Sequence, residues 1–157
     1  TQIALDITEA LVYLHSLDPI VIHGHLHSRH ILLDGELRPK IGNVGVIASV
    51  SDDISVIATA AVYWIAPEIL TAEPYDESTD IYSLGVLLSE MDTHTLPFMD
   101  RSSPSVYQFT AACPLEIRSL AQCCLSLDSS ARPSGLQVAY ELRLLLSPER
   151  GPDPYAK

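Results

Sequence analysis

The segment from residue 79 to residue 91, TDIYSLGVLLSEM, combines helical periodicity with very few charges. Its apolar side chains recur at the three- and four-residue spacing that places them on one face of an α-helix. These positions are Leu84, Leu87, Leu88 and Met91. A helix whose remaining surface is also nearly uncharged is buried from more than one side. We therefore predict that this helix is deeply buried.

Three other segments show amphipathic periodicity. Residues 2–15, residues 115–125 and the stretch opened by Pro133 and Ser134 each repeat apolar side chains at helical spacing. The positions expected to face the interior are Ile3, Ile7, Leu11, Leu14, Leu115, Ile117, Leu120, Ala121, Cys124, Leu136, Val138, Ala139, Leu142 and Leu145. A short helix is expected after Pro67, and no internal repeat or linker divides the chain. The pattern predicts one mainly α-helical domain.

Two stretches between the first helix and the buried one lack helical periodicity. Residues 31–33 and 39–41 are short apolar segments on either side of an Asp-Gly pair, which predicts a small β-hairpin. Residues 20–22, before the hairpin, form a β-prone apolar run. From residue 42 to residue 61 the chain is poor in large side chains and has no period, so we expect a long loop there.

Composition argues against several classes of partner. The 157 residues carry a formal net charge of −11, and the sequence pI is about 4.7. A field of this sign repels nucleic-acid phosphates and anionic lipid headgroups, so we expect neither as a partner. No apolar run reaches the roughly 18–20 residues that span a bilayer. The three cysteines lack the spacing of a disulfide framework, so we expect reduced thiols and an intracellular, cytoplasmic location.

Four of the six histidines, His23, His25, His27 and His30, lie within eight positions. Strand-like alternation would place the first three on one side, and neutral imidazoles bind Zn²⁺ well. No cysteine or carboxylate joins them at ligand spacing, however. We therefore favour loop positions whose side chains point in different directions, and we assign no metal site.

Six sequence motifs follow one another in an order found in one protein family. YLHSLDPIVIHGHLHSRHILL resembles the stretch with the H-R-D-L-x-x-x-N catalytic loop, KIGNVG takes the place of D-F-G, and VYWIAPEIL contains A-P-E. STDIYSLGVLLSEM resembles a long central helix, PF follows it, and SLDSSARPS resembles the segment with a lobe-closing arginine. The chain thus resembles the C-terminal lobe of a eukaryotic-type protein kinase of the tyrosine-kinase-like class.

The resemblance covers residues 2–147 and carries a prediction of fold. It implies a mainly α protein-kinase-like C-terminal lobe over residues 1–147, built as a helical bundle with a small β-hairpin at the catalytic loop. Residues 148–157 are expected to form a flexible tail. The chain begins at Thr1 within a helical pattern, which suggests a piece of something longer.

The family pattern implies that the residues for phosphoryl transfer are replaced. His25 stands in the place of the catalytic Asp, His30 in the place of the Mg²⁺-binding Asn, and Asn43 in the place of the D-F-G Asp. Gly24 takes the place of an Arg, and His27 that of a Lys. Mg²⁺ prefers oxygen ligands in octahedral geometry, so imidazoles and a neutral amide form a poor site. Loss of one major electrostatic group costs about 10²–10³ in rate, and several are lost together.

The positions that keep the fold are retained. By the resemblance, Glu68 pairs with Arg132, and Asp80 accepts hydrogen bonds from the backbone of the histidine loop beside His23. Leu32 and its neighbours would form the floor beneath the adenine position. The residues that keep the fold are retained while those that carry out phosphoryl transfer are replaced, and this pattern favours a pseudokinase.

Individual residues elsewhere have a functional and an ordinary interpretation. Asp52 and Asp53 in the long loop are more consistent with solvation than with phosphate mimicry, since the usual arginine is missing. Cys123 and Cys124 are better explained as core cysteines of a helix than as a redox pair. Trp64 is better explained by packing under the A-P-E turn than by contact with a peptide.

The expected function is that of a pseudokinase acting through a protein partner, such as an active kinase or its own upstream domain. These 157 residues contain no Gly-rich phosphate loop and no V-A-I-K lysine. We therefore expect no cofactor, and ATP with Mg²⁺ only if an N-terminal lobe lies upstream and the site is atypical. A Ser/Thr kinase with such a site and a His-rich metal-binding module are the alternatives. Whether the chain is an enzyme stays open, with the residues weighing against it.

Overall fold

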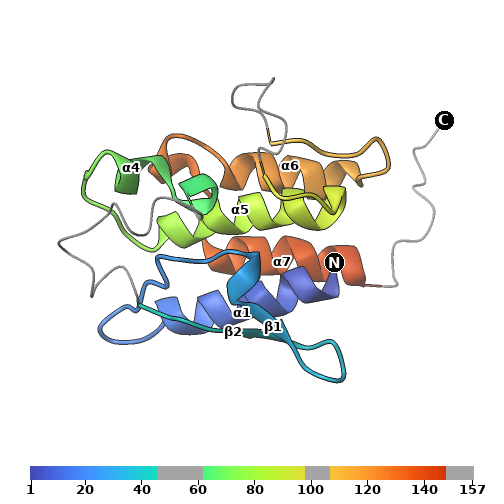
Figure 1. Cartoon of the computed structure of the whole chain (residues 1–157), viewed down its shortest axis with the longest axis horizontal. Helices are drawn as coiled ribbons and strands as arrows, with labels where there is room; N and C mark the ends of the chain where they lie inside the picture. Colours follow the sequence, from blue (N-terminus) through green and yellow to red (C-terminus); the bar gives the residue numbers. More distant parts are fainter. Residues whose placement is uncertain (46–61, 98–106, 148–157) are drawn as a thin grey trace.

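The computed structural model describes residues 1–45, 62–97 and 107–147. In these ranges the chain forms mainly helices and one two-stranded sheet (Figure 1). The elements are α1 (Gln2–His15), η1 (Ser28–His30), β1 (Ile31–Leu33), β2 (Pro39–Ile41), η2 (Val62–Trp64), α4 (Pro67–Leu70), α5 (Ser78–Thr93), α6 (Leu115–Cys124), η3 (Ser129–Ala131) and α7 (Gly135–Leu146). The mainly α fold with a small hairpin is confirmed.

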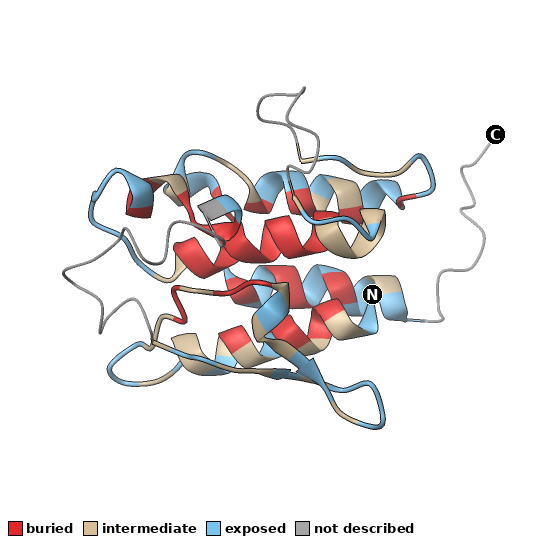
Figure 2. Ribbon diagram, viewed as in Figure 1, coloured by how far each residue is buried: buried red, intermediate tan, exposed pale blue. Residues whose placement is uncertain are grey.

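Helix α5 is the buried helix predicted from its low charge. Every residue from Thr79 to Ser89 is buried, and Figure 2 shows this helix as a nearly continuous buried ribbon. Helix α6 packs closely on it at Gly85, where an added Cβ would lie 2.9 Å from Cβ of Cys124. That distance is shorter than carbon–carbon contact, so the approach of the two helices depends on the missing side chain.

Helices α1 and α7 pack side by side and complete the core (Figure 1). The N-terminus of α7 has a capping box, in which the side chain of Ser134 accepts from the Gln137 N–H and the Gln137 side chain accepts from the Ser134 N–H. Ile7 and Leu11 of α1 are buried as predicted, as are Val138, Ala139 and Leu142 of α7.

The predicted inward orientation is wrong at two leucines. Leu115 and Leu136 are 74% and 67% exposed. Each lies in the first turn of its helix, α6 or α7, where the neighbouring helix does not cover it. Cys123 is also exposed, whereas Cys124 is fully buried, so only one of the two adjacent cysteines belongs to the core. Both thiols are free, as is that of Cys113.

The hairpin forms at the predicted residues. Strands β1 and β2 pair antiparallel, with Ile31 opposite Ile41. The turn is held by Asp34, whose Oδ1 accepts from the N–H groups of Glu36 and Arg38, each at 2.9 Å. The β-prone run at residues 20–22 forms no strand, which corrects that expectation.

An ion pair between Glu68 of α4 and Arg132 ties α4 to the segment before α7. The two Nη atoms of Arg132 donate to the two carboxylate oxygens at 2.6 and 2.8 Å, and its Nε donates to the Ser126 carbonyl at 2.9 Å. Its guanidinium also lies 5.1 Å from the ring centroid of Tyr82. Burial opposes ionisation of Glu68, but the hydrogen bonds and charge of Arg132 prevail, so its pKa is lowered.

Several sequence predictions lie outside the described residues. These are most of the long loop, with Asp52 and Asp53, and the tail at residues 148–157. Among the helices in the described ranges, none has the length and apolar character required to span a membrane.

Replacing Glu68 with alanine is expected to destabilise the fold strongly. The change leaves the guanidinium of Arg132, which is fully buried, without its counter-ion, and such losses cost about 3–5 kcal/mol. Urea unfolding measures the loss. The matched control is Glu9→Ala, which breaks an exposed pair with Arg143 and is expected to cost about 0–1 kcal/mol. Equal losses in the two variants would contradict the prediction.

Candidate functional site

Asp80, in the first turn of α5, holds the histidine loop in place. Its carboxylate is buried and accepts from the backbone N–H groups of His23 and Gly24, each at 2.8 Å. A third contact comes from Nε2 of His15, at the end of α1, at 2.9 Å. These bonds join the loop, α1 and α5 at one carboxylate. The expected contacts between Asp80 and the loop are present, and that with His15 was not foreseen.

His23 is fully buried and uses both ring nitrogens. Nε2 donates to the carbonyl of Gly42 at 2.9 Å, and Nδ1 accepts from the N–H of His25 at 3.2 Å. Burial lowers the pKa of His23, although the nearby carboxylate of Asp80 opposes the shift. The ring therefore stays neutral at pH 7 and links the loop to the residue that follows β2.

Two residues next to these contacts have left-handed backbone. Gly24 has φ of +72° and Asn43 has φ of +58°. Glycine adopts this region freely, and asparagine is one of the few other residues that visits it routinely. The residues that replace the family's Arg and Asp thus suit the backbone that they occupy.

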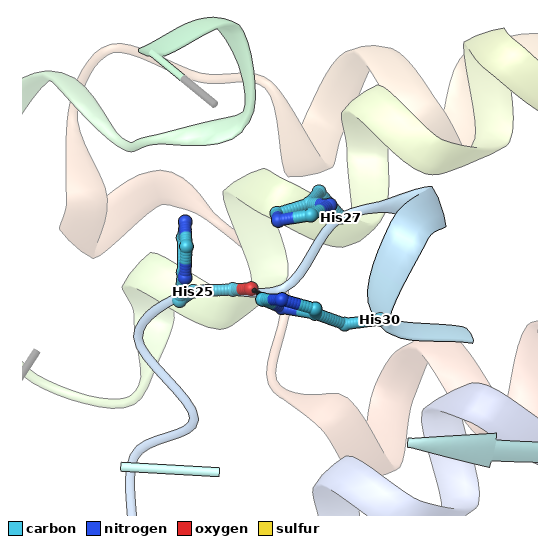
Figure 3. A group of neighbouring side chains, drawn as sticks. All are labelled: His25, His27 and His30. Carbon is cyan, nitrogen blue, oxygen red and sulfur yellow. Dashed lines mark hydrogen bonds between the residues drawn. The ribbon is translucent and has the colours of Figure 1, made fainter. Parts of the chain in front are cut away.

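His25, His27 and His30 point toward one another (Figure 3). The ring centroids are 4.8 Å apart for His25 and His27, 4.8 Å for His25 and His30, and 3.9 Å for His27 and His30. The expectation that these side chains point in different directions is wrong. The 3₁₀ turn Ser28–His30 brings His30, its last residue, close to His27, its N-cap.

His30 and Asn43, the two positions where the family binds Mg²⁺, contact each other. Nδ1 of His30 lies 2.9 Å from the carbonyl of His25 and donates to it. Its Nε2 is therefore an acceptor, and the amide nitrogen of Asn43 donates to it at 2.9 Å. An imidazole and an amide satisfy each other at the place where Mg²⁺ requires oxygen ligands.

The ring nitrogens of His25 lack this kind of contact. Both are inaccessible to water and have no hydrogen-bond partner among the described residues. Burial lowers the pKa of His25, and the neighbouring His30 and His23 lower it further. Its imidazole is neutral at pH 7 and supplies none of the charge of the aspartate it replaces.

His27 is buried and lies against Trp64, with ring centroids 5.6 Å apart. Burial, followed by electrostatic repulsion from the neighbouring histidines and Arg29, lowers the pKa of His27 to about 4. Trp64 is itself buried, and its Nε1 donates to Oε2 of Glu90 at 3.1 Å. The packing role predicted for Trp64 is confirmed.

Leu32, the residue expected beneath adenine, lies on β1 with 64% of its surface exposed. Leu33 is also exposed, and Ile31 is partly buried against the core. Because successive residues of a strand point to opposite faces, Leu32 and Leu33 expose apolar surface on the two different faces of the hairpin, with Lys40 opposite Leu32. The role of Leu32 in nucleotide binding stays a prediction.

The fold and the retained contacts define a protein-kinase-like C-terminal lobe. The family model described as "Protein kinase domain" matches residues 1–142, nearly the whole chain. The chain therefore belongs to the protein kinase domain family.

Several kinases are similar to this chain. "Probable serine/threonine-protein kinase drkD" of Dictyostelium discoideum is 29% identical over 142 residues, which cover 85% of this chain and 11% of that protein. "Dual specificity testis-specific protein kinase 1" of Rattus norvegicus is 30% identical over 177 residues, with coverages of 99% and 28%. "Serine/threonine/tyrosine-protein kinase HT1" of Arabidopsis thaliana is 32% identical over 144 residues, with coverages of 84% and 36%. The chain spans between 11% and 36% of the length of these relatives.

Replacing Asp80 with alanine is expected to release the histidine loop. Two buried amides lose their acceptor, at about 1–3 kcal/mol each, so unfolding by urea should show a loss of about 2–6 kcal/mol. The control is Asp34→Ala, which also removes a carboxylate that accepts from two N–H groups, but in an exposed turn that water can reach. A loss at Asp34 as large as that at Asp80 would count against the prediction.

Stability is expected to depend on pH through His27. Its pKa is 6.5 in the unfolded chain and about 4 in the folded one, so the unfolded chain takes up the proton first. The free energy of unfolding therefore falls as the pH falls from about 6.5 to about 4. Urea titrations over this range measure the free energy of unfolding of the wild type and of His27→Phe. The value for the wild type minus that for the variant should fall as the pH falls. A difference independent of pH would show that His27 does not contribute.

Proposed function

We propose that this domain is a pseudokinase of the tyrosine-kinase-like class, which does not transfer phosphate and acts through protein binding. The observation that carries the proposal is the hydrogen bond between His30 and Asn43. In the family these positions supply the oxygen ligands of Mg²⁺. Here an imidazole and an amide occupy them and satisfy each other.

The charges around the site support the same proposal. Phosphoryl transfer relies on positioned metal ions and on a carboxylate near the attacking hydroxyl. His25 at the carboxylate position is neutral, and Asp80, the nearby acid, already accepts three hydrogen bonds. Removing one such electrostatic group typically costs about 10²–10³ in rate. Simultaneous changes at His25, His30 and Asn43 leave little basis for catalysis.

A role in protein binding is supported by the retained scaffold. The ion pair of Glu68 with Arg132 and the contacts of Asp80 are intact. The exposed side chains of Leu32 and Leu33 on the hairpin suit coverage by a protein surface. We propose an active kinase or an upstream domain of the same chain as that partner. The three free cysteines suit a reducing, intracellular compartment.

Phosphotransfer by the full-length gene product tests the proposal. We expect no incorporation of γ-phosphate from ATP and Mg²⁺ into a generic peptide, and no shift of the melting temperature by ATP that requires Mg²⁺. Turnover that is lost on Asn43→Ala would establish the alternative, a Ser/Thr kinase with an atypical site.

Restoring the family's residues provides the matched comparison. The variant His25→Asp, His30→Asn, Asn43→Asp returns the two carboxylates and the amide that hold Mg²⁺ and accept the hydroxyl proton. If the product carries a nucleotide-binding lobe, this variant is expected to gain a Mg²⁺-dependent shift with ATP that the wild type lacks. A wild type that responds to ATP and Mg²⁺ as strongly as the variant would contradict the proposed cause.

A further inference from the structure

The histidine cluster that replaces the catalytic residues has the composition of a transition-metal site. One nitrogen from each of His25, His27 and His30 can be chosen such that all three lie within 4.8 Å of one another. The rings come from the loop and from the adjoining 3₁₀ turn, and they lie close together (Figure 3). The backbone of the loop and of the 3₁₀ turn therefore holds the three rings near one another.

The cluster also contains polar atoms that hydrogen bonding leaves unexplained. Both nitrogens of His25 are buried from water and unpaired within the described ranges. Leaving a buried polar group unpaired is unfavourable, and native proteins do so at few positions. A bound ion would supply the missing partner. This observation is independent of the convergence of the rings.

We propose that His25, His27 and His30 bind a divalent transition-metal ion of the Zn²⁺ type. Three imidazoles suit Zn²⁺, Cu²⁺ or Ni²⁺, whereas Mg²⁺ and Ca²⁺ require oxygen ligands. In tetrahedral coordination three protein ligands leave a fourth position to water. The site would thus have replaced the family's Mg²⁺ chemistry with ligation by nitrogen.

The distances require only small movements of the rings. With Zn–N bonds of about 2.0–2.1 Å in tetrahedral geometry, ligand nitrogens lie about 3.3 Å apart. The present separations are up to 4.8 Å, so binding requires the nitrogens to approach one another by up to about 1.5 Å.

The hydrogen bonds of His30 prepare it for ligation. Its Nδ1 donates to the carbonyl of His25, which fixes the tautomer in which Nε2 carries the lone pair. Such bonds orient metal-binding imidazoles in known sites. Within the described ranges only the exposed Asn43 amide donates to Nε2, so binding exchanges one exposed hydrogen bond for a metal bond.

Metal binding would break a hydrogen bond of His27 but none of His25. Nδ1 of His27 accepts a long hydrogen bond of 3.2 Å from the N–H of Arg29, so ligation through Nε2 requires the other tautomer and the loss of that bond. His25 loses nothing, because neither of its nitrogens has a partner among the described residues. Ligation would tie the loop to the 3₁₀ turn.

Titration of the purified, metal-free chain with Zn²⁺ against a chelator of known affinity tests the proposal. We expect one tight ion per chain. His25→Leu is expected to weaken binding by more than the roughly 10–100-fold that loss of an outer-shell partner costs. The control His94→Asn removes an exposed imidazole whose left-handed backbone asparagine tolerates, and it should leave the affinity unchanged. Equal affinities for wild type and His25→Leu, or no saturable binding, would overturn the proposal.

Folding and the exposed thiol are controlled separately. His25→Leu removes two unpaired buried nitrogens, so without metal its melting temperature should be no lower than that of the wild type. Zn²⁺ should raise the melting temperature of the wild type alone. If His25→Leu fails to fold, His30→Gln provides the second test of affinity. Binding that survives in both variants but is lost on Cys123→Ser would assign the ion to the exposed thiol and overturn the proposal.

Cobalt provides a spectroscopic test of the ligands. Co²⁺ in a tetrahedral site absorbs visible light, and thiolate ligands add a charge-transfer band in the near ultraviolet. Visible absorption without that band, abolished in His25→Leu, is expected. A thiolate band would contradict the assignment. Neither measurement involves phosphate transfer, so its outcome is separate from that of the pseudokinase proposal.

Discussion

The carboxylate of Asp80 is the interaction on which the site depends. It lies buried in the first turn of α5, where the helix dipole favours negative charge, and it accepts from two loop amides and from His15. Only an ionised carboxylate has enough acceptor positions for three donors at one place. Because the loop starts from this fixed point, the ring of His23 reaches the Gly42 carbonyl and the following histidines enter the site.

The residues that hold the fold and those that replace the chemistry form separate sets. Glu68, Arg132 and Asp80 are buried, and loss of any one leaves a charge or an amide without its partner. His30 and Asn43 are less buried, and they satisfy each other with one neutral hydrogen bond. A chain can therefore change the second set at little cost in stability while the first set preserves the architecture of the protein kinase domain family.

The substituted loop has physical properties that the family's own residues would not give it. The imidazoles of His25 and His27 are neutral at pH 7 and so avoid the mutual repulsion that charged groups would suffer, because burial lowers the pKa values of both. Neutral imidazole is also the form that binds transition metals. The two proposals, loss of phosphate transfer and binding of a transition metal, share one origin, the replacement of hard oxygen ligands by imidazoles. They differ because the first concerns an activity and the second a ligand.

The sequence by itself determined the helices, the hairpin and the family, since these depend on local periodicity and on motifs within short segments. It also indicated the pairing of Glu68 with Arg132, through the resemblance. Tertiary structure alone decided that His25, His27 and His30 converge, that His15 reaches Asp80, and that Leu136 is exposed. The 3₁₀ turn places His27 and His30 close together, but the sequence did not predict that turn. Periodicity shows which side chains share a face of an element, whereas the path of a loop and the position of a neighbouring helix determine what that face meets.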